Sequence, residues 1–200
     1  YSREGTSATL VPISPDTKLR LVNSLEDCND MMRWLGERRP TNLIGLDIET
    51  GAPNRAHLNP RAPGARVRLI QVGDGEAGWA VPAHGWGGAA MELLNKWDGR
   101  IALHNAAFDT QWLRIHYGWN VPWSRLVDTM LCAKIMRPGK PAQLKQLACE
   151  LVDPYADSGQ TALAAAFKNN GWDWNSIPLD HPAMWSFSAL DPVVTGFLYE

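Results

Sequence analysis

The order of the apolar segments limits this chain to folds in which strands and helices alternate. A strand pattern at 18–22 precedes a helical pattern that Ser24 opens, and an apolar strand at 42–48 precedes a hairpin pattern at 67–81. Further on we expect a helix at 89–97, a strand at 101–103, and helices at 108–117, 127–136, 143–152, 161–169 and from 184 to the end. This order is typical of an α/β fold with a mixed β-sheet flanked by helices.

Composition narrows the class of protein. Because 45% of the 200 residues are hydrophobic and 20% are charged, the chain reads as one globular domain, expected over 18–200 after a polar leader at 1–17. A formal net charge of −2 excludes a general basic coat for nucleic acid. No apolar run reaches the ~18 residues of a membrane span. Three scattered cysteines, Cys28, Cys132 and Cys149, favour a reducing cytoplasm.

Two acidic residues end the apolar strand pattern at 42–48. Asp47 and Glu49 are two positions apart, so both side chains project from the same face of a strand. Buried carboxylates are costly unless cations or metal ions neutralise them. One interpretation is therefore a metal site, and the other is a pair of edge carboxylates that accept hydrogen bonds from loop amides.

Two more acidic residues lie in otherwise apolar surroundings. Asp109 falls in the first turn of a helix, where its alternative role is to stabilise the helix dipole, and Asp191 interrupts the apolar final helix, where exposure is the alternative. Four converging carboxylates repel one another unless divalent cations lie among them, and hard oxygen ligands favour Mg²⁺ or Mn²⁺. Two such ions are the arrangement that hydrolyses phosphodiesters. We therefore expect one shared pocket at the edge of the sheet.

Three motifs resemble, in order and spacing, those of the DnaQ-like (DEDD) 3′–5′ exonucleases. They are LDIET at 46–50, HNAAFD at 104–109 and FSALDPVVT at 187–195. The stretch at 127–151 resembles the proofreading domain of family A DNA polymerases. The late segment, with its proline and paired tryptophans, resembles polymerases of actinobacterial viruses, which implies the host cytoplasm. The resemblance covers 18–200.

This resemblance implies a ribonuclease H-like fold and hydrolysis of the terminal phosphodiester of single-stranded or frayed DNA from its 3′ end. Carried over by motif, Asp47, Glu49, Asp109 and Asp191 would hold two Mg²⁺ or Mn²⁺ ions, and Glu49 would also contact the terminal 3′ hydroxyl. The implied partner beyond the DNA is a polymerase domain in a longer chain. The implied substrate-binding residues are Ile48, Thr50, Asn105 and Phe108.

One position departs from the family pattern. The polymerase branch has a tyrosine four residues before the last aspartate, whose hydroxyl helps to place the attacking water, and here that residue is Phe187. The sister branch has a histidine five residues before that aspartate, where this chain has Ser186. We therefore expect reduced activity, and Phe187→Tyr is expected to raise the rate modestly.

Two other functions stay open at the level of sequence: a ribonuclease D-like exoribonuclease, and a weakened module that binds nucleic acid or a polymerase partner without cutting. His104 is interpreted as a structural hydrogen-bonding residue, and Trp172 and Trp174 as packing residues rather than base-stacking platforms. Scattered basic residues are interpreted as solvated surface, with phosphate contact as the alternative: Arg66, Arg68, Arg137, Lys140 and Lys145.

Overall fold

The computed structural model describes residues 13–52 and 59–199. Six strands form one mixed sheet in the order β1-β4-β3-β2-β5-β6. Within the described residues β3 alone runs against the others, because it pairs antiparallel with β2 and β4 while the remaining pairs are parallel. The strands are β1 (Lys18–Leu21), β2 (Leu43–Gly51), β3 (Arg66–Gly73), β4 (Ala77–Pro82), β5 (Arg100–Leu103) and β6 (Leu126–Asp128).

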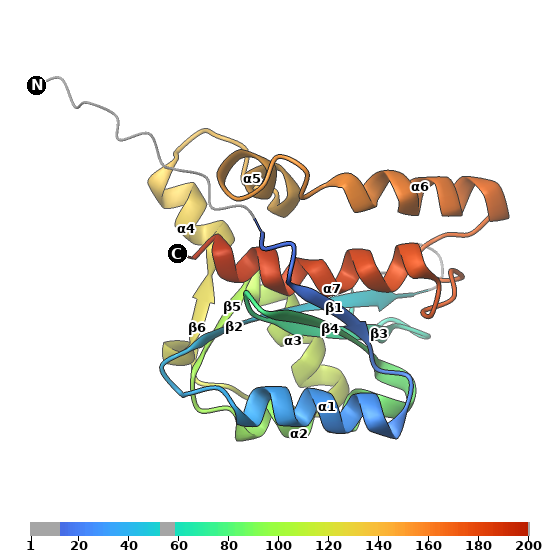
Figure 1. The fold of residues 1–200 in the computed structure, drawn as a ribbon, viewed down its shortest axis with the longest axis horizontal. Coiled ribbons are helices and arrows are strands. Elements are labelled where there is room, and N and C mark those ends of the chain that lie inside the picture. The colour runs from blue at the N-terminus through green and yellow to red at the C-terminus, as the bar shows by residue number, and fades with distance from the viewer. Residues whose placement is uncertain (1–12, 53–58, 200) are drawn as a thin grey trace, which may run out of the picture.

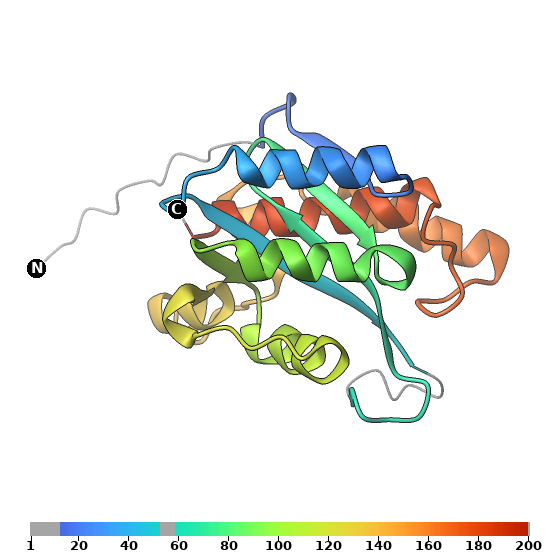
Figure 2. The same cartoon turned by 90° about the horizontal axis from the view of Figure 1, so that it is seen from below.

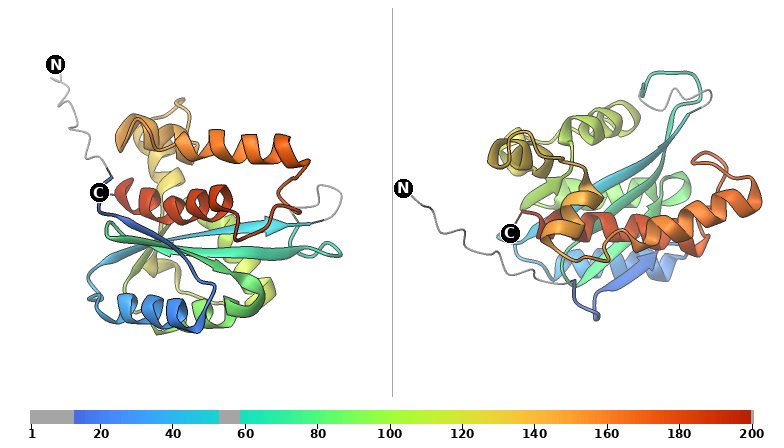
Figure 3. Two further views of the ribbon diagram at one scale, coloured as in Figure 1. Left: turned by 45° about the vertical axis from the view of Figure 1, so that its right-hand side comes forward. Right: turned by 90° about the horizontal axis from the view of Figure 1, so that it is seen from above.

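Helices cover both faces of this sheet (Figure 1). On one face α1 and α2 lie side by side, with α3 beside them (Figure 2). On the other face α7 crosses the strands, and α5 and α6 form a further layer outside it (Figure 3). The helices are α1 (Leu25–Gly36), α2 (Ala83–Lys96), α3 (Ala106–Tyr117), α4 (Thr129–Met136), α5 (Leu144–Leu151), α6 (Ser158–Asn170) and α7 (Pro182–Phe197).

The side chains of β2 alternate between the two layers. Ile44, Leu46 and Ile48 belong to the larger hydrophobic cluster, which also contains buried residues of α1, α2 and α3. The alternate residues of the strand, among them Asp47 and Glu49, therefore face α7. Alternation along β2 thus separates side chains that enter the larger core from two carboxylates that lie under α7, on a face with a second hydrophobic cluster.

Helix α7 lies directly on the backbone of the sheet. A Cβ added to Gly45 would be 1.8 Å from the carbonyl oxygen of Pro192, and one added to Gly78 would be 2.0 Å from that of Ala189. No side chain fits at either strand position, so glycine is required there for the close approach. Because Asp191 precedes Pro192 and Asp47 lies two residues after Gly45, this contact brings the two aspartates together.

The expected α/β architecture with a mixed sheet is confirmed. Ser24 is the N-cap of α1 and accepts a hydrogen bond from the Asp27 backbone N–H at 3.1 Å. The hairpin expected at 67–81 is the pair β3–β4. Most of the 1–17 leader lies outside the described residues, as does the middle of the loop expected at 50–66. None of the helices in the described ranges combines the length and hydrophobicity that a membrane span requires.

Some expected boundaries are wrong. The helix expected at 127–136 begins only at Thr129, because Leu126–Asp128 pairs with β5 as a parallel strand. The helix expected at 89–97 begins at Ala83 and is kinked at His84 and Gly85. The loop expected from residue 50 starts later, since β2 continues to Gly51 alongside β3. Each difference reflects strand pairing or tertiary packing that a local pattern does not contain.

Candidate metal centre and active site

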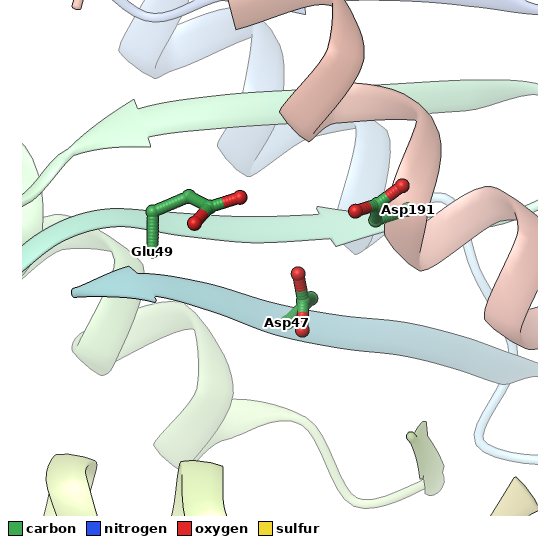
Figure 4. Close-up of side chains that lie close together, drawn as sticks. All are labelled: Asp47, Glu49 and Asp191. Atoms are coloured by element: carbon green, nitrogen blue, oxygen red, sulfur yellow. The ribbon is translucent and has the colours of Figure 1, made fainter. Parts of the chain in front are cut away.

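Three carboxylates meet between β2 and α7. The expected position at the edge of the sheet is wrong, because β2 is an interior strand with β3 and β5 on either side. One oxygen from each of Asp47, Glu49 and Asp191 lies within 4.8 Å of the others. Figure 4 shows them pointing toward one another, two from the strand and one from the helix. They are brought together by the two-residue spacing on β2 and by the close packing of α7 on Gly45.

Asp109 is not among the three acids that lie within 4.8 Å of one another. It is buried in the first turn of α3, which packs against β3, β5 and β6, whereas Asp191 comes from α7. Its carboxylate is nevertheless close enough to Asp47 and Glu49 for their charges to raise its pKa. The structure therefore groups three of the four expected carboxylates tightly and places the fourth within electrostatic reach of two of them.

Burial and mutual repulsion govern the charge of these groups. Burial, followed by the charge of Asp191, raises the pKa of Asp47 to about 8. Burial, followed by the charges of Asp47 and Asp191, raises the pKa of Glu49 well above its usual range. Burial chiefly raises the pKa of Asp109, and the charge of Asp47 adds to the effect. At neutral pH this metal-free cluster therefore retains protons that ordinary carboxylates would have lost.

One basic side chain reaches the trio. Lys145, in the first turn of α5, forms an ion pair with Asp191, and both side chains are nearly buried, at 12% and 7% exposure. Its charge lowers the pKa of Asp191 against the larger raising effect of burial. On the other side of the trio, the Ser188 hydroxyl donates a long hydrogen bond of 3.5 Å to Glu49 Oε1.

Phe187 lies one helical turn before Asp191 and is 7% exposed. The Lys145 ammonium nitrogen is 4.2 Å from the centroid of its ring, and Trp174 packs against the same ring at 6.3 Å. The side chain at the usual tyrosine position is thus an apolar ring that makes a cation–π contact with Lys145.

The second motif is held by the carboxylate of Asp128. Asn105, the N-cap of α3, is in the left-handed region with φ 76°. The backbone N–H groups of Asn105 and Ala106 donate to Asp128 at 3.2 and 2.9 Å. The same carboxylate caps α4 by accepting from Met130 and Leu131. Asp128 is not among the residues predicted from the sequence, although an aspartate at the start of a helix is a recognised N-cap signal.

His104 has the structural role expected of it. Its Nε2 is 2.8 Å from the carbonyl oxygen of Ala142 and its Nδ1 is 2.9 Å from the Thr129 hydroxyl. Burial lowers the pKa of His104, and in the neutral ring Nε2 donates to the Ala142 carbonyl. The ring therefore ties the second motif to the segment that leads into α5.

The remaining expected substrate-binding residues occupy different environments. The side chain of Ile48 is 5% exposed and belongs to the core, so only its backbone is left for contact with a substrate. Thr50 follows a register shift in the β2–β3 ladder and is partly exposed. Phe108 is partly exposed and packs on Trp112 at 5.9 Å.

Interpreting the scattered basic residues as solvated surface was wrong for two of them. Arg68 is 8% exposed and donates to the backbone carbonyls of Trp174 and Ile177, so it holds the loop before α7. Lys145 lies in the carboxylate cluster. The sequence did contain an indication that Lys145 is near negative charge. A cation in the first turn of a helix interacts unfavourably with the helix dipole unless negative charge is near.

The two late tryptophans take part in packing, as expected. Trp172 stacks edge-on with His181 at 5.3 Å, and Trp174 with Phe167 at 5.3 Å. Trp174 also remains 42% exposed.

The donor set suits divalent cations. The clustered ligand atoms are all carboxylate oxygens, which are the ligands of Mg²⁺ and Mn²⁺ rather than of zinc in a thiol or imidazole site. When ionised, the three clustered acids and Asp109 carry four negative charges, more than the ammonium of Lys145 and the nearby guanidinium of Arg68 neutralise. The residues present therefore fit a site for positively charged ions.

Comparison with known proteins now places this arrangement in a family. The sequence profile of a family described as 3′–5′ exonuclease matches residues 22–200. The chain belongs to the DnaQ-like 3′–5′ exonucleases. No curated protein sequence matches this exonuclease domain significantly.

Solved structures show the same fold at low sequence identity. The exonuclease domain of Nibbler from Aedes aegypti has a TM-score of 0.66 and 15% identity, over 96% of this chain and 89% of that one. The catalytic core of RRP6 from Trypanosoma brucei has a TM-score of 0.63 and 17% identity, over 96% and 48%. RNase D from Escherichia coli has a TM-score of 0.60 and 19% identity, over 89% and 42%.

The exonuclease domain described here thus spans about half the length of the RRP6 core and less than half of RNase D. The mixed sheet flanked by helices is the ribonuclease H-like fold that the resemblance implied.

Proposed function

We propose that this domain hydrolyses the terminal phosphodiester at the 3′ end of single-stranded or frayed DNA and releases nucleoside 5′-monophosphates, as in proofreading. The observation that carries the proposal is the convergence of Asp47, Glu49 and Asp191 within 4.8 Å, with Asp109 in electrostatic reach. Support for DNA comes from the family profile, which resembles the exonuclease domain of family A DNA polymerases.

In this proposal Asp47, Glu49, Asp109 and Asp191 would hold two Mg²⁺ or Mn²⁺ ions. When bound, such ions activate water and stabilise the charge that develops on the phosphate and the leaving oxygen. Glu49 would accept a hydrogen bond from the terminal 3′ hydroxyl, which distinguishes a chain end from an internal position. Asn105 and Phe108, at the start of α3, would border the terminal nucleotide, with Ile48 and Thr50 contributing from β2.

A ribonuclease D-like activity is the second candidate. The observation that favours it is that solved structures similar to this chain include RNase D, described as an exoribonuclease involved in structured RNA processing. The choice depends on contacts to the 2′ position of the sugar. Matched deoxyribose and ribose oligonucleotides of one sequence therefore belong in the same experiment.

The test is digestion of 5′-labelled single-stranded oligonucleotides with Mn²⁺ and with excess chelator. We expect stepwise shortening from the 3′ end with Mn²⁺, none with chelator, and faster cleavage of DNA than of RNA. Asp47→Ala combined with Glu49→Ala should reduce the rate by more than about 10³-fold. Its fold should survive, because removing clustered like charges relieves repulsion.

The matched control is Glu26→Ala with Asp98→Ala, which removes two exposed acids elsewhere and should leave the rate unchanged. Cleavage that continues undiminished in chelator would contradict the metal-dependent mechanism. Preference for RNA would replace the proposal by the ribonuclease D-like activity. Binding of a 3′ end without any cleavage would replace it by the weakened module.

A further inference from the structure

We propose that Lys145 is a catalytic residue of this exonuclease site, whose ammonium group contacts the attacking water in place of the tyrosine hydroxyl that Phe187 lacks. The inference rests on the proposed function. In the two branches of the family, a tyrosine or a histidine of the third motif orients the water, and this chain has neither residue there. The inference assigns that role to one buried lysine.

The position of the ammonium supports this assignment. It lies on Asp191, a member of the carboxylate trio, and 4.2 Å from the centroid of the Phe187 ring. The ammonium therefore contacts Phe187, which is the residue at the position of the missing tyrosine hydroxyl. The cation therefore contacts both the usual tyrosine position and the last aspartate.

The hydrogen-bonding capacity of the ammonium supports it further. A lysine ammonium has three donor hydrogens. Among the described residues its one hydrogen-bond partner is Asp191 Oδ1. A site for hydrolysis offers a water and phosphate oxygens as acceptors, so the donors left over have a use during the reaction.

Burial makes a purely surface role untenable. The Lys145 side chain is 12% exposed, and taking an ammonium out of water is costly unless opposite charge and further contacts compensate. Here Asp191 and the face of Phe187 compensate, and the positive charge also acts on Asp47 and Glu49, whose pKa values it lowers. The cation is thus coupled to all three clustered carboxylates.

The scaffold holds the lysine in this place. The segment before α5 is fixed by the hydrogen bond between His104 Nε2 and the Ala142 carbonyl, three residues before Lys145. His104 immediately precedes Asn105 in the second motif. The helix that carries the ammonium is therefore attached to the part of the chain that borders the proposed substrate.

A double-mutant cycle between Lys145 and Phe187 tests the inference. Single-turnover rates on one DNA oligonucleotide at saturating Mn²⁺ are compared for wild type, Lys145→Met, Phe187→Tyr and the double variant. We expect Lys145→Met alone to slow cleavage about 10²-fold, the usual scale for one positioned proton-transfer or hydrogen-bonding group. In the Phe187→Tyr background the same change should cost less than about fivefold, because the hydroxyl then orients the water.

A second readout does not depend on cleavage. Lys145→Met should tighten Mn²⁺ binding in calorimetry about tenfold without DNA, because the ammonium no longer competes for Asp191. The control is Lys140→Met, an exposed lysine in the preceding loop, which should change neither rate nor affinity. Thermal unfolding verifies that each variant is folded.

The outcomes separate the two proposals. If wild type does not cleave with Mn²⁺, the proposed function fails and this inference fails with it. If wild type cleaves and Lys145→Met is as fast, or is equally slow with and without Phe187→Tyr, the proposed function stands and the role of Lys145 is overturned. Unchanged Mn²⁺ affinity in Lys145→Met would also count against the contact with Asp191.

Discussion

At the scale of single residues, the charge of the carboxylate trio depends on what neutralises it. With its pKa raised to about 8, Asp47 is mostly protonated in the metal-free protein at pH 7. A metal ion binds the carboxylate and not the acid, so Mn²⁺ binding at pH 7 should release protons and should tighten as pH rises toward 9. Calorimetry in two buffers of different ionisation enthalpy measures this release.

The control for proton release is Asp47→Asn, in which the release should fall. A binding heat that does not depend on the buffer would contradict the raised pKa.

Among the site residues, sequence could predict Asp47 and Glu49 together, because strand alternation alone places them on one face. It could not predict that Asp109 lies outside the group within 4.8 Å or that Lys145 contacts that group, since both depend on how α3 and α5 pack.

At the scale of elements, the site depends on the contact between β2 and α7. Gly45→Ala should destabilise the domain by about 1–3 kcal/mol, because the new methyl group would overlap the Pro192 carbonyl and force the helix away. The shift should also weaken Mn²⁺ binding by moving Asp191 from Asp47. Denaturant unfolding and calorimetry measure the two effects.

Gly88→Ala is the matched control, since an added Cβ there meets nothing within 4 Å and lies in α2. It should be neutral or stabilising by up to ~1 kcal/mol. Equal effects of the two substitutions would show that the close approach of α7 is not required.

Sequence predicted the elements with long periodic patterns. It did not predict the three-residue β6, because that strand forms only by pairing with β5, which is distant in the sequence.

At the scale of the whole molecule, His104 connects the second motif to two other parts of the chain. It contacts Thr129 at the start of α4 and the Ala142 carbonyl in the segment before α5. Because burial lowers its pKa in the folded state, the unfolded chain binds a proton more readily as pH falls below about 6.5. The stabilisation that His104 contributes is therefore present above that pH and is lost below it. Unfolding free energies between pH 7.5 and 5 should show this decline.

His104→Gln should lower stability at pH 7.5 and flatten the decline, whereas His84→Gln, at an exposed position, should leave both unchanged. An identical pH profile for wild type and His104→Gln would contradict the link. At this scale sequence could predict the fold class but not the order of the strands in the sheet. For example, β1 pairs with β4, although α1, β2 and β3 lie between them along the chain.

The carboxylate of Asp128 has a consequence for how this domain would look in a mutational scan. It holds four backbone N–H groups, two at the start of α3 and two at the start of α4, and so fixes Asn105 and the turn that carries Asp109. Its loss would misplace those residues without removing any proposed metal ligand. A screen that scores cleavage would therefore report five essential acidic residues, and only a structural measurement would separate Asp128, which holds backbone N–H groups, from the four proposed metal ligands.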